Sequence, residues 1–323
     1  MFHRRSVLAG IAASVAAPHV RAQETYPARA ITLVVPFPAG GSTDIIARVV
    51  ADAMRAQLKV PVVVENRGGA GGTLGTGVVA RANPDGYTIG MGTASTLAIN
   101  PAAYKTLPYD VLSDLTPIGA IAEVPNIMEI NPAMPVTDMA SFIVYAKAGP
   151  GRITYGSSGL GSVSHLMGEQ FKRATGTDLV HIPYRGVGPA LSDAVAGQIL
   201  VMFDNLPTSL PLVQAGKLRA LAVSSKKRLT ALPDVPTFAE LKIDDLDWTA
   251  FFGLVAPART PSLAIGALNE ALNNALTEPM VREKLAEQQA TVMQGTPEAF
   301  GALISREVAR MKRACEAAKI SIE

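Results

Sequence analysis

Two glycine-rich junctions carry the groups in this sequence that could hold an anion. The first, PFPAGGSTD at residues 36–44, follows the apolar run AITLVV, and the second, YGSSGLGS at residues 155–162, follows another predicted strand. Each junction precedes a segment with helical periodicity. The start of a helix leaves backbone N–H groups unpaired and carries a partial positive charge. Glycine lets an anion approach that backbone, and serine or threonine hydroxyls add donors, so each junction predicts a carboxylate site without lysine or arginine.

One such junction alone has an ordinary structural explanation. A glycine-rich turn often precedes a helix, and Ser42, Thr43 and Asp44 are all typical N-cap residues. Two junctions at corresponding places in two successive units favour a functional explanation. Ligands of open α/β sheets bind beyond the carboxyl ends of the strands, where both junctions are expected. If the two units face each other, both junctions would close on one ligand by a hinge motion.

The elements that would position these junctions alternate between strand and helix. In the first unit, strands are predicted at 30–35, 60–65 and 87–92, with helices at 44–58 and 73–82. In the second, strands are predicted at 126–131, 152–155, 179–182, 199–203 and 218–224, with helices at 139–148, 163–175 and 188–196. This alternation predicts parallel sheets with crossover helices. Residues 248–255 are interpreted as a return crossing, and the tail is predicted to be helical at 262–276, 279–289 and 297–318.

The N-terminal segment has the three-part pattern of an export signal. Arg4 and Arg5 precede a short apolar stretch, and VRA at residues 20–22 fits a cleavage site, so residues 1–22 are predicted to be removed after Ala22. The arginine pair leaves general secretory and twin-arginine export both open. Removal takes away three arginines and no acid, which lowers the formal charge from +2 to −1. A near-neutral body argues against nucleic acid as a partner, and no apolar run reaches the roughly 20 residues of a membrane span.

The composition argues against metal and cofactor chemistry. Cys315 is the only cysteine, which excludes an internal disulfide. Beyond the predicted signal only the histidines His165 and His181 remain, and two histidines are too few for a typical histidine-based metal site. Ser158 or Ser162 with His165 leaves an exported hydrolase open as an alternative, although no orienting third group or nucleophile elbow is apparent. We therefore expect no cofactor, no metal and no enzymatic activity.

Taken together, several motifs resemble those of the Bug-type solute receptors, the substrate-binding components of tripartite tricarboxylate transporters. They are PFPAGGSTDIIAR (36–48), VVVENRGGAGG (62–72), ANPDGYT (82–88), ITYGSSG (153–159), HIPYRG (181–186), FDN (203–205), GKLRALAV (216–223) and LPDVPT (232–237). The motifs span most of the chain beyond the signal. Their combination is specific, although each motif alone is not.

The resemblance implies a fold and a set of site residues. The fold class is α/β: a two-lobe periplasmic binding protein (type II-like), each lobe a mostly parallel sheet flanked by helices and joined to the other by crossing strands. The expected division is a signal at 1–22, a first lobe at 23–124 plus 250–323, and a second lobe at 125–249. The ligand-binding residues carried over onto this sequence are Phe37, Ala39, Gly40, Ser42 and Thr43 in the first junction, Thr93 and Ser95 as a wall, Ser157, Ser158, Gly159 and Ser162 in the second junction, and Asp204 on the far side.

The resemblance also implies partners and a cellular location. The chain would be a monomeric periplasmic receptor that captures a small mono- or dicarboxylic acid and delivers it to a tripartite tricarboxylate membrane permease. The identity of the acid does not follow from the resemblance. A ligand sensor that docks on a membrane signalling partner would use the same site and stays open, as does the serine–histidine hydrolase.

Overall fold

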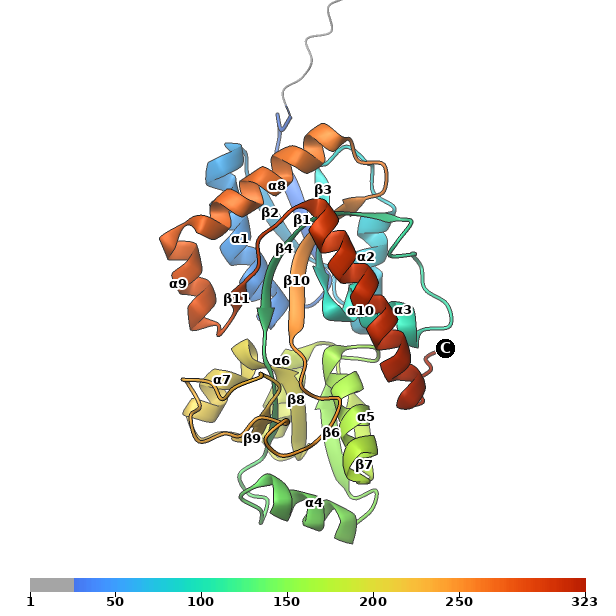
Figure 1. Cartoon of the computed structure of the whole chain (residues 1–323), viewed down its shortest axis with the longest axis vertical. Coiled ribbons are helices and arrows are strands. Elements are labelled where there is room, and N and C mark those ends of the chain that lie inside the picture. Colours follow the sequence, from blue (N-terminus) through green and yellow to red (C-terminus); the bar gives the residue numbers. More distant parts are fainter. Residues whose placement is uncertain (1–25) are drawn as a thin grey trace, which may run out of the picture.

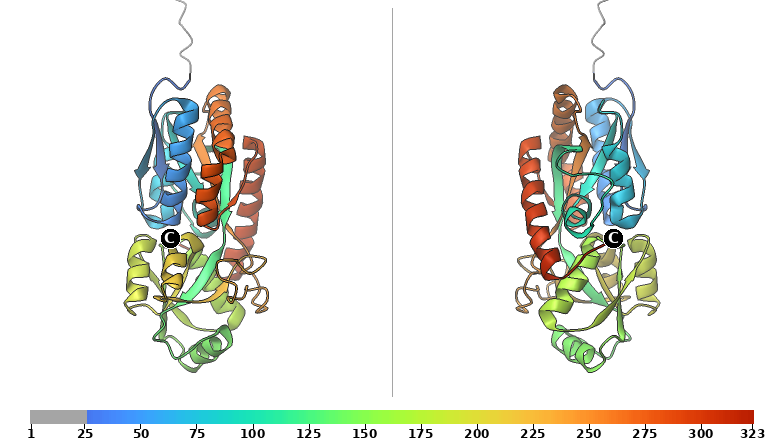
Figure 2. Two further views of the ribbon diagram at one scale, coloured as in Figure 1. Left: turned by 90° about the vertical axis from the view of Figure 1, so that its left-hand side faces the viewer. Right: turned by 90° about the vertical axis from the view of Figure 1, so that its right-hand side faces the viewer.

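Two β-sheets divide the chain, and each is the centre of one lobe. The computed structural model describes residues 26–323, so the predicted signal at 1–22 lies outside the described residues. The two lobes are stacked along the longest axis of the molecule (Figure 1), and the side views of Figure 2 show the strands that join them. Within residues 26–323, no helix is both long and apolar enough to cross a membrane.

The first lobe is built on a six-stranded sheet in the order β11-β4-β10-β3-β1-β2. Its strands are β1 (Ile31–Val35), β2 (Val62–Asn66), β3 (Thr88–Thr93), β4 (Leu115–Val124), β10 (Ala250–Pro257) and β11 (Thr291–Val292). Its helices are α1 (Ser42–Leu58), α2 (Thr73–Ala80), α3 (Asn100–Ala103), α8 (Ser262–Thr277), α9 (Pro279–Glu287) and α10 (Pro297–Ala317), with the 3₁₀ turn η1 (Ala70–Gly72) and the π-helix η2 (Ser95–Ile99). The C-terminal helices α8 and α10 both pack against β4 of this sheet.

The second lobe is built on a five-stranded sheet in the order β7-β6-β8-β5-β9. Its strands are β5 (Asn126–Ile130), β6 (Ile153–Ser157), β7 (Leu179–Pro183), β8 (Val201–Asn205) and β9 (Arg219–Val223). Its helices are α4 (Met139–Ala148), α5 (Val163–Thr175), α6 (Val187–Val195) and α7 (Leu206–Gln214). The bounds predicted for α4 and α5 are those observed.

Two segments cross between the lobes and set the strand directions. β4 passes through Pro125 directly into β5, and β10 returns from the second lobe to pair antiparallel with both β3 and β4. The two-lobe α/β class is confirmed, but each sheet is mixed rather than mostly parallel. In the second lobe β5 runs away from the first lobe, whereas β8 runs toward it, so these neighbours pair antiparallel. β1 with β2 and β3, and β6 with β7 and β8, are parallel as predicted.

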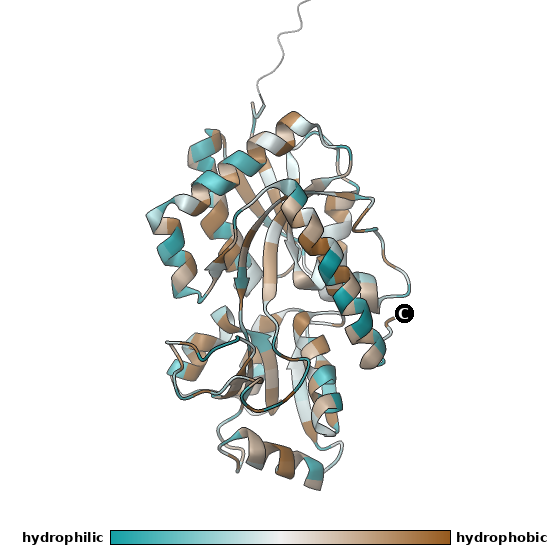
Figure 3. Ribbon diagram, viewed as in Figure 1, coloured by the Kyte–Doolittle hydropathy of each residue, from teal (hydrophilic) through white to brown (hydrophobic). Residues whose placement is uncertain are grey.

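Hydrophobic burial explains why these segments fold together. The predicted first strand has Ile31, Leu33 and Val35 fully buried, and the return crossing β10 is buried along its whole length. Figure 3 shows hydrophobic residues along the central strands and hydrophilic ones on the outer faces of α8 and α9. The carboxyl ends of β1, β3, β6, β7 and β8 meet where the lobes adjoin, which brings the loops that follow them together.

Candidate functional site

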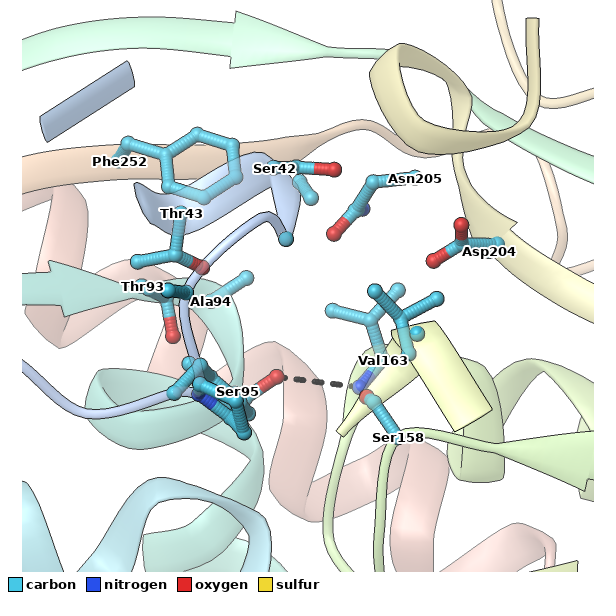
Figure 4. Close-up of a pocket in the computed structure, with 17 residues that line it drawn as sticks. Ser42, Thr43, Thr93, Ala94, Ser95, Ser158, Val163, Asp204, Asn205 and Phe252 are labelled. Atoms are coloured by element: carbon cyan, nitrogen blue, oxygen red, sulfur yellow. Dashed lines mark hydrogen bonds between the residues drawn. The ribbon is translucent and has the colours of Figure 1, made fainter. Parts of the chain in front are cut away.

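A cavity lies between the two lobes and is lined by residues of both (Figure 4). About 540 Å³ of space lies between its atoms, part of it open to solvent, but the room for the centres of water-sized molecules is only about 40 Å³. The lining residues are Phe37, Pro38, Ala39, Gly41, Ser42, Thr43, Thr93, Ala94, Ser95 and Phe252 with Ala250 from the first lobe, and Ser158, Val163, Val187, Gly188, Asp204 and Asn205 from the second. No lysine or arginine is among them.

The first junction presents the start of α1 to this cavity. The N-cap is Gly41 rather than Ser42, Thr43 or Asp44, and no side chain caps the first turn of this helix. Asp44 instead accepts a hydrogen bond from the Gly40 amide (2.9 Å) and pairs with Arg48 (2.9 Å). Burial alone would raise the pKa of Asp44, but the hydrogen bonds from the Arg48 side chain, the Gly40 amide and the Asn66 side chain together lower it. The first amides of α1 are thus left for another acceptor.

The second junction presents less of its helix start than predicted. Ser162 is the N-cap of α5, and its hydroxyl accepts from the amide of the third helical residue (3.3 Å) and donates to the Gly159 carbonyl (2.7 Å). The backbone amide of Val163, the first helical residue, donates across the lobes to the Ser95 hydroxyl (3.1 Å). This hydrogen bond is the dashed line in Figure 4. Ser158 is the predicted residue of this junction that reaches the cavity.

A third helix start, not singled out from the sequence, completes the cavity. Val187 and Gly188 open α6, its N-cap Gly186 has φ +102°, and no side chain caps it. The segment HIPYRG before it repeats the strand–glycine–helix pattern of the two junctions, so the signal was present in the sequence. Three helix starts therefore converge on one cavity, and their partial positive charges favour an anion there.

The π-helix η2 positions the wall of the cavity that follows β3. The Asn100 amide donates to the Ser95 carbonyl, which closes the wide π turn, and the Thr93 amide donates to the Thr96 hydroxyl (3.1 Å). π-helical turns are rare and frequently occur at functional sites. This turn holds the Ser95 hydroxyl at the cavity, opposite Val163 of the other lobe.

Asp204 forms the far side, at the end of β8. Its side chain is only 3% exposed and accepts hydrogen bonds from the hydroxyls of Thr208 and Ser209 (Ser209 at 3.1 Å). Burial raises the pKa of Asp204 to about 7, in spite of these hydrogen bonds. Next to it, Asn205 donates to the side-chain oxygen of Asn126 at the crossing (2.7 Å).

The structure brings most of the predicted site residues to the cavity but not all. Those that line it are Phe37, Ala39, Ser42, Thr43, Thr93, Ser95, Ser158 and Asp204. Gly40, Ser157, Gly159 and Ser162 lie outside the lining and shape the turns; Gly40 and Gly159 have positive φ values of +83° and +130°. Lining residues that the sequence analysis did not name include Gly41, Val163, Val187, Gly188, Asn205, Ala250 and Phe252. Contact of any of these residues with a ligand stays a prediction.

The serine–histidine pairing also differs from the one considered above. His165 Nδ1 accepts from the Gly161 amide (3.3 Å) and pairs with neither Ser158 nor Ser162. The actual pair is Ser157 Oγ with His181 Nε2 (2.6 Å), and the Ser157 side chain is 0% exposed and outside the cavity lining. Among residues 26–323 no group of three His, Cys, Asp or Glu side chains could hold a metal ion.

The fold and the interlobe cavity define the class of this protein as a two-lobed α/β periplasmic binding protein. A protein solved as a periplasmic transporter superposes with a TM-score of 0.89 at 46% identity, covering 92% of this chain and 100% of the other. An R. palustris protein solved with adipate gives 0.88 at 37% identity, covering 92% and 99%. MatC from Rhodopseudomonas palustris, solved with bound malate, gives 0.86 at 32% identity, covering 90% and 99%.

Sequence comparison defines the family. The model of the tripartite tricarboxylate transporter family receptor matches residues 46–320. Protein BugT of Bordetella pertussis is 40% identical over 303 residues, which is 94% of this chain and 91% of BugT. The chain belongs to the family of tripartite tricarboxylate transporter receptors, and the resemblance to Bug-type receptors is confirmed.

Proposed function

We propose that this protein is an extracytoplasmic receptor that captures a small mono- or dicarboxylic acid between its lobes and delivers it to a tripartite tricarboxylate membrane permease. The observation that carries the proposal is the convergence of the α1, α5 and α6 starts on one cavity that no lysine or arginine lines. Export by the predicted signal 1–22 and action as a monomer without enzymatic activity belong to the same proposal. The adipate and malate bound by two relatives support the choice of a carboxylic acid.

Recognition of the acid is divided between the two lobes. One carboxylate is held by the free amides at the start of α1, with the Ser42 and Thr43 hydroxyls as further donors. Ser158 contributes its hydroxyl from the second lobe. The rings of Phe37 and Phe252 line the apolar part of the cavity and select small, partly apolar acids. A ligand that bridges both lobes stabilises the closed arrangement over the open one, which is a hinge mechanism.

The hinge follows from the two crossings. We take the described residues up to 124, together with 250–323, as one lobe and residues 125–249 as the other, so that β4–β5 and the segment leading into β10 connect them. Asn126 lies at the first crossing, and its side chain donates to the Trp248 carbonyl at the second (2.9 Å). The two connections are thus tied together, which favours a single bending axis.

A thermal-shift screen of the protein lacking residues 1–22 tests the proposal. The panel contains acetate, succinate, malate, adipate, citrate and benzoate. An acid at 100 times its Kd is expected to add about 2.7 kcal/mol to the free energy of unfolding. Absence of any response across the panel, together with hydrolysis of a small ester, would favour the hydrolase that Ser157 and His181 could form.

A double substitution locates the site. Ser42→Ala with Ser158→Ala removes one hydroxyl from each lobe and is expected to weaken binding of the best acid of the panel by about thirtyfold to 150-fold, at about 1–1.5 kcal/mol for each of the two hydrogen bonds. Ser305→Ala is the matched control, because this exposed hydroxyl bonds only the Gly301 carbonyl of its own helix (3.0 Å). Equal affinity of the double variant and the control would mean that the two junctions are scaffolding.

A further inference from the structure

Two carboxyl groups lie together in the second lobe, directly behind the cavity. Glu129 on β5 is 0% exposed and Asp204 on the neighbouring β8 is 3% exposed. The Ser209 hydroxyl lies between them, 2.6 Å from Glu129 Oε1 and 3.1 Å from Asp204 Oδ2. Within residues 26–323, neither carboxyl forms a salt bridge. Buried acids without a cation are rare, because burial of an unpaired charge is costly.

Counting hydrogen atoms favours at least one proton on this pair. The Ser209 hydroxyl has a single hydrogen, so it can donate to one carboxyl only. Both short contacts are full two-centre hydrogen bonds if the other carboxyl is protonated and donates to the serine oxygen. Among residues 26–323 Glu129 Oε2 has no hydrogen-bond partner, which is costly for a charged oxygen. Burial raises the pKa of Glu129 to about 8 and that of Asp204 to about 7, in agreement with the geometry.

A chain of hydroxyl groups connects this pair to the opposite lobe. Asp204 Oδ2 accepts from the Thr208 hydroxyl, whose oxygen lies 3.2 Å from Ser42 Oγ at the start of α1. The chain therefore runs Ser42–Thr208–Asp204–Ser209–Glu129 and crosses from the first lobe to the second. Asp204 also lines the cavity, so closure of the lobes removes it from water and adds Ser42 of the first lobe to this chain.

Most ionisable groups on the elements packed around the pair are engaged elsewhere. α7 carries none. On β9, α6, α5 and α1, the partners are Arg219 with the Val136 carbonyl, Asp193 with the Tyr184 hydroxyl, Glu169 with Lys172, Arg173 with Asp245, His165 with the Gly161 amide, and Asp44 with Arg48. The charge that changes beside Asp204 on binding is therefore that of the ligand itself.

We propose that this receptor captures its carboxylate together with a proton, which is taken up by the Glu129–Asp204 pair as the lobes close. The inference rests on the proposed function and extends it. An ionised Asp204 would face an anionic ligand with like charge in a cavity shielded from water. A protonated Asp204 instead has no charge to repel the anion and can donate a hydrogen bond to it. The site thus selects acids that arrive with a proton, and the affinity decreases as the pH rises.

Calorimetric titration in buffers of different ionisation enthalpy measures the proton uptake directly. The probe is the acid of the six-member panel that stabilises the wild type most. Uptake approaching one proton is expected near pH 8, with the Kd rising by up to about tenfold per pH unit between about pH 7 and 9. Glu129→Gln keeps an acceptor for Ser209 and lies outside the cavity lining, so it is expected to retain binding near pH 6 while losing the part of this pH dependence that Glu129 carries.

Glu123→Gln is the matched control, because Glu123 is also a strand residue that accepts from a hydroxyl, that of Thr249 (2.7 Å). This variant is expected to keep the proton uptake of the wild type. Carbon-13 NMR of the carboxyl groups in the ligand-free protein gives a second readout, in which Glu129 is expected to titrate near the pH of 8 that burial predicts. Titration of both carboxyls below about pH 5, as in unfolded chains, would overturn the proposal.

The outcomes separate this inference from the function on which it rests. Binding of an acid without proton uptake refutes the coupling and leaves the receptor function intact. No binding of any acid removes both. Uptake that persists unchanged in Glu129→Gln would leave Asp204 as the only member of the pair that takes up the proton and would overturn the role of Glu129.

Discussion

The stacked imidazoles of His165 and His181 have a distinct pH signature. Their ring centroids are 4.3 Å apart, and the Tyr155 ring stacks on the other face of His181 at 4.8 Å. Burial, then the neighbouring His165 and Lys172, lowers the pKa of His181 to about 3. The unfolded chain takes up a proton on this residue below about pH 6.5, whereas the folded chain stays neutral. The stability that this histidine contributes is thus present above pH 6.5 and lost as the pH falls toward 3.

His181→Gln tests this dependence. Glutamine can still hydrogen-bond Ser157 but cannot protonate, and it loses the stacking. We expect a lower Tm than wild type at about pH 7.5, because aromatic stacking is worth about 0.5–1.5 kcal/mol, but a smaller loss of Tm between about pH 7.5 and 5. Differential scanning calorimetry across this range measures both effects, and parallel Tm curves for the two proteins would contradict the assignment. Glu129 and Asp204 are unchanged in both, so their opposite contribution cancels in the comparison.

Single residues of the site were predictable where local sequence determines their place. Ser42 and Thr43 were expected at the cavity because a strand, a glycine pair and a helix follow one another. The contact of Ser157 with His181 was not, because it depends on the pairing of β6 with β7, in which Tyr155 lies beside His181. The same holds for the Val163 amide, whose partner Ser95 is 68 residues away and on the other lobe.

At the scale of elements, the sequence predicted most helices and missed elements whose residues break the local rules. α4 and α5 were found with their observed bounds. α7 contains Pro207 and Pro211, which argue against a helix by local rules, although Pro207 lies at the helix start where proline is tolerated. β4 is a crossing strand, buried over most of its length and interrupted by Pro117 and Gly119, so it shows no alternation. Neither β4 nor the π-helix η2 was predicted.

The loop between β2 and α2 must pass close to the opposite lobe, and Gly71 makes this approach possible. A Cβ at this position would lie 2.0 Å from the Leu160 carbonyl oxygen of the second lobe. Opening the lobes would remove the clash, so Gly71→Ala is expected to fold but to resist closure. We expect its affinity for the best acid of the panel to fall more than about tenfold, since a clash of more than 1.4 kcal/mol has this effect.

Gly216→Ala separates the clash from backbone strain. Gly71 has φ +60° and Gly216 has φ +67°, but a Cβ at Gly216 would meet nothing within 4 Å. Both variants are expected to lose a similar amount of Tm in the ligand-free state, and only Gly71→Ala is expected to lose affinity. Titration calorimetry gives the affinities, and small-angle scattering gives the ligand-induced compaction. Equal affinities would show that Gly71 does not limit closure.

For the whole molecule, the cavity, the crossings and the acid pair form one connected unit. Asn126 is fully buried at the first crossing, and its side-chain oxygen accepts a hydrogen bond from Asn205 of the cavity lining. Its side-chain nitrogen donates to the Trp248 carbonyl at the second crossing. On the other side of Asn205, Asp204 belongs to the hydroxyl chain that reaches Ser42 of the first lobe. The residues that line the cavity are thus in direct contact with the groups that move when the lobes open.

A disulfide across the cavity tests whether the ligand enters only when the lobes part. Ser42 and Thr208 lie one on each lobe with their hydroxyl oxygens 3.2 Å apart, close enough for sulfur atoms to bond at about 2.05 Å after a small adjustment. The double variant Ser42→Cys with Thr208→Cys, oxidised without ligand, is expected to bind no acid. Oxidised in the presence of acid, it is expected to retain the acid through gel filtration until a reductant is added. Cys315 is 1% exposed and does not compete.

The single variant Ser42→Cys is the control, because it measures the effect of the lost hydroxyl without a crosslink. The affinity of the reduced double variant, compared with this control, isolates the contribution of Thr208. If the oxidised protein exchanged acid as fast as the reduced protein, the cavity would be reached by a route that needs no motion of the lobes. Receptor closure would then have to be assigned to docking on the permease rather than to capture of the ligand, because the two lobes would already be closed when the acid arrives.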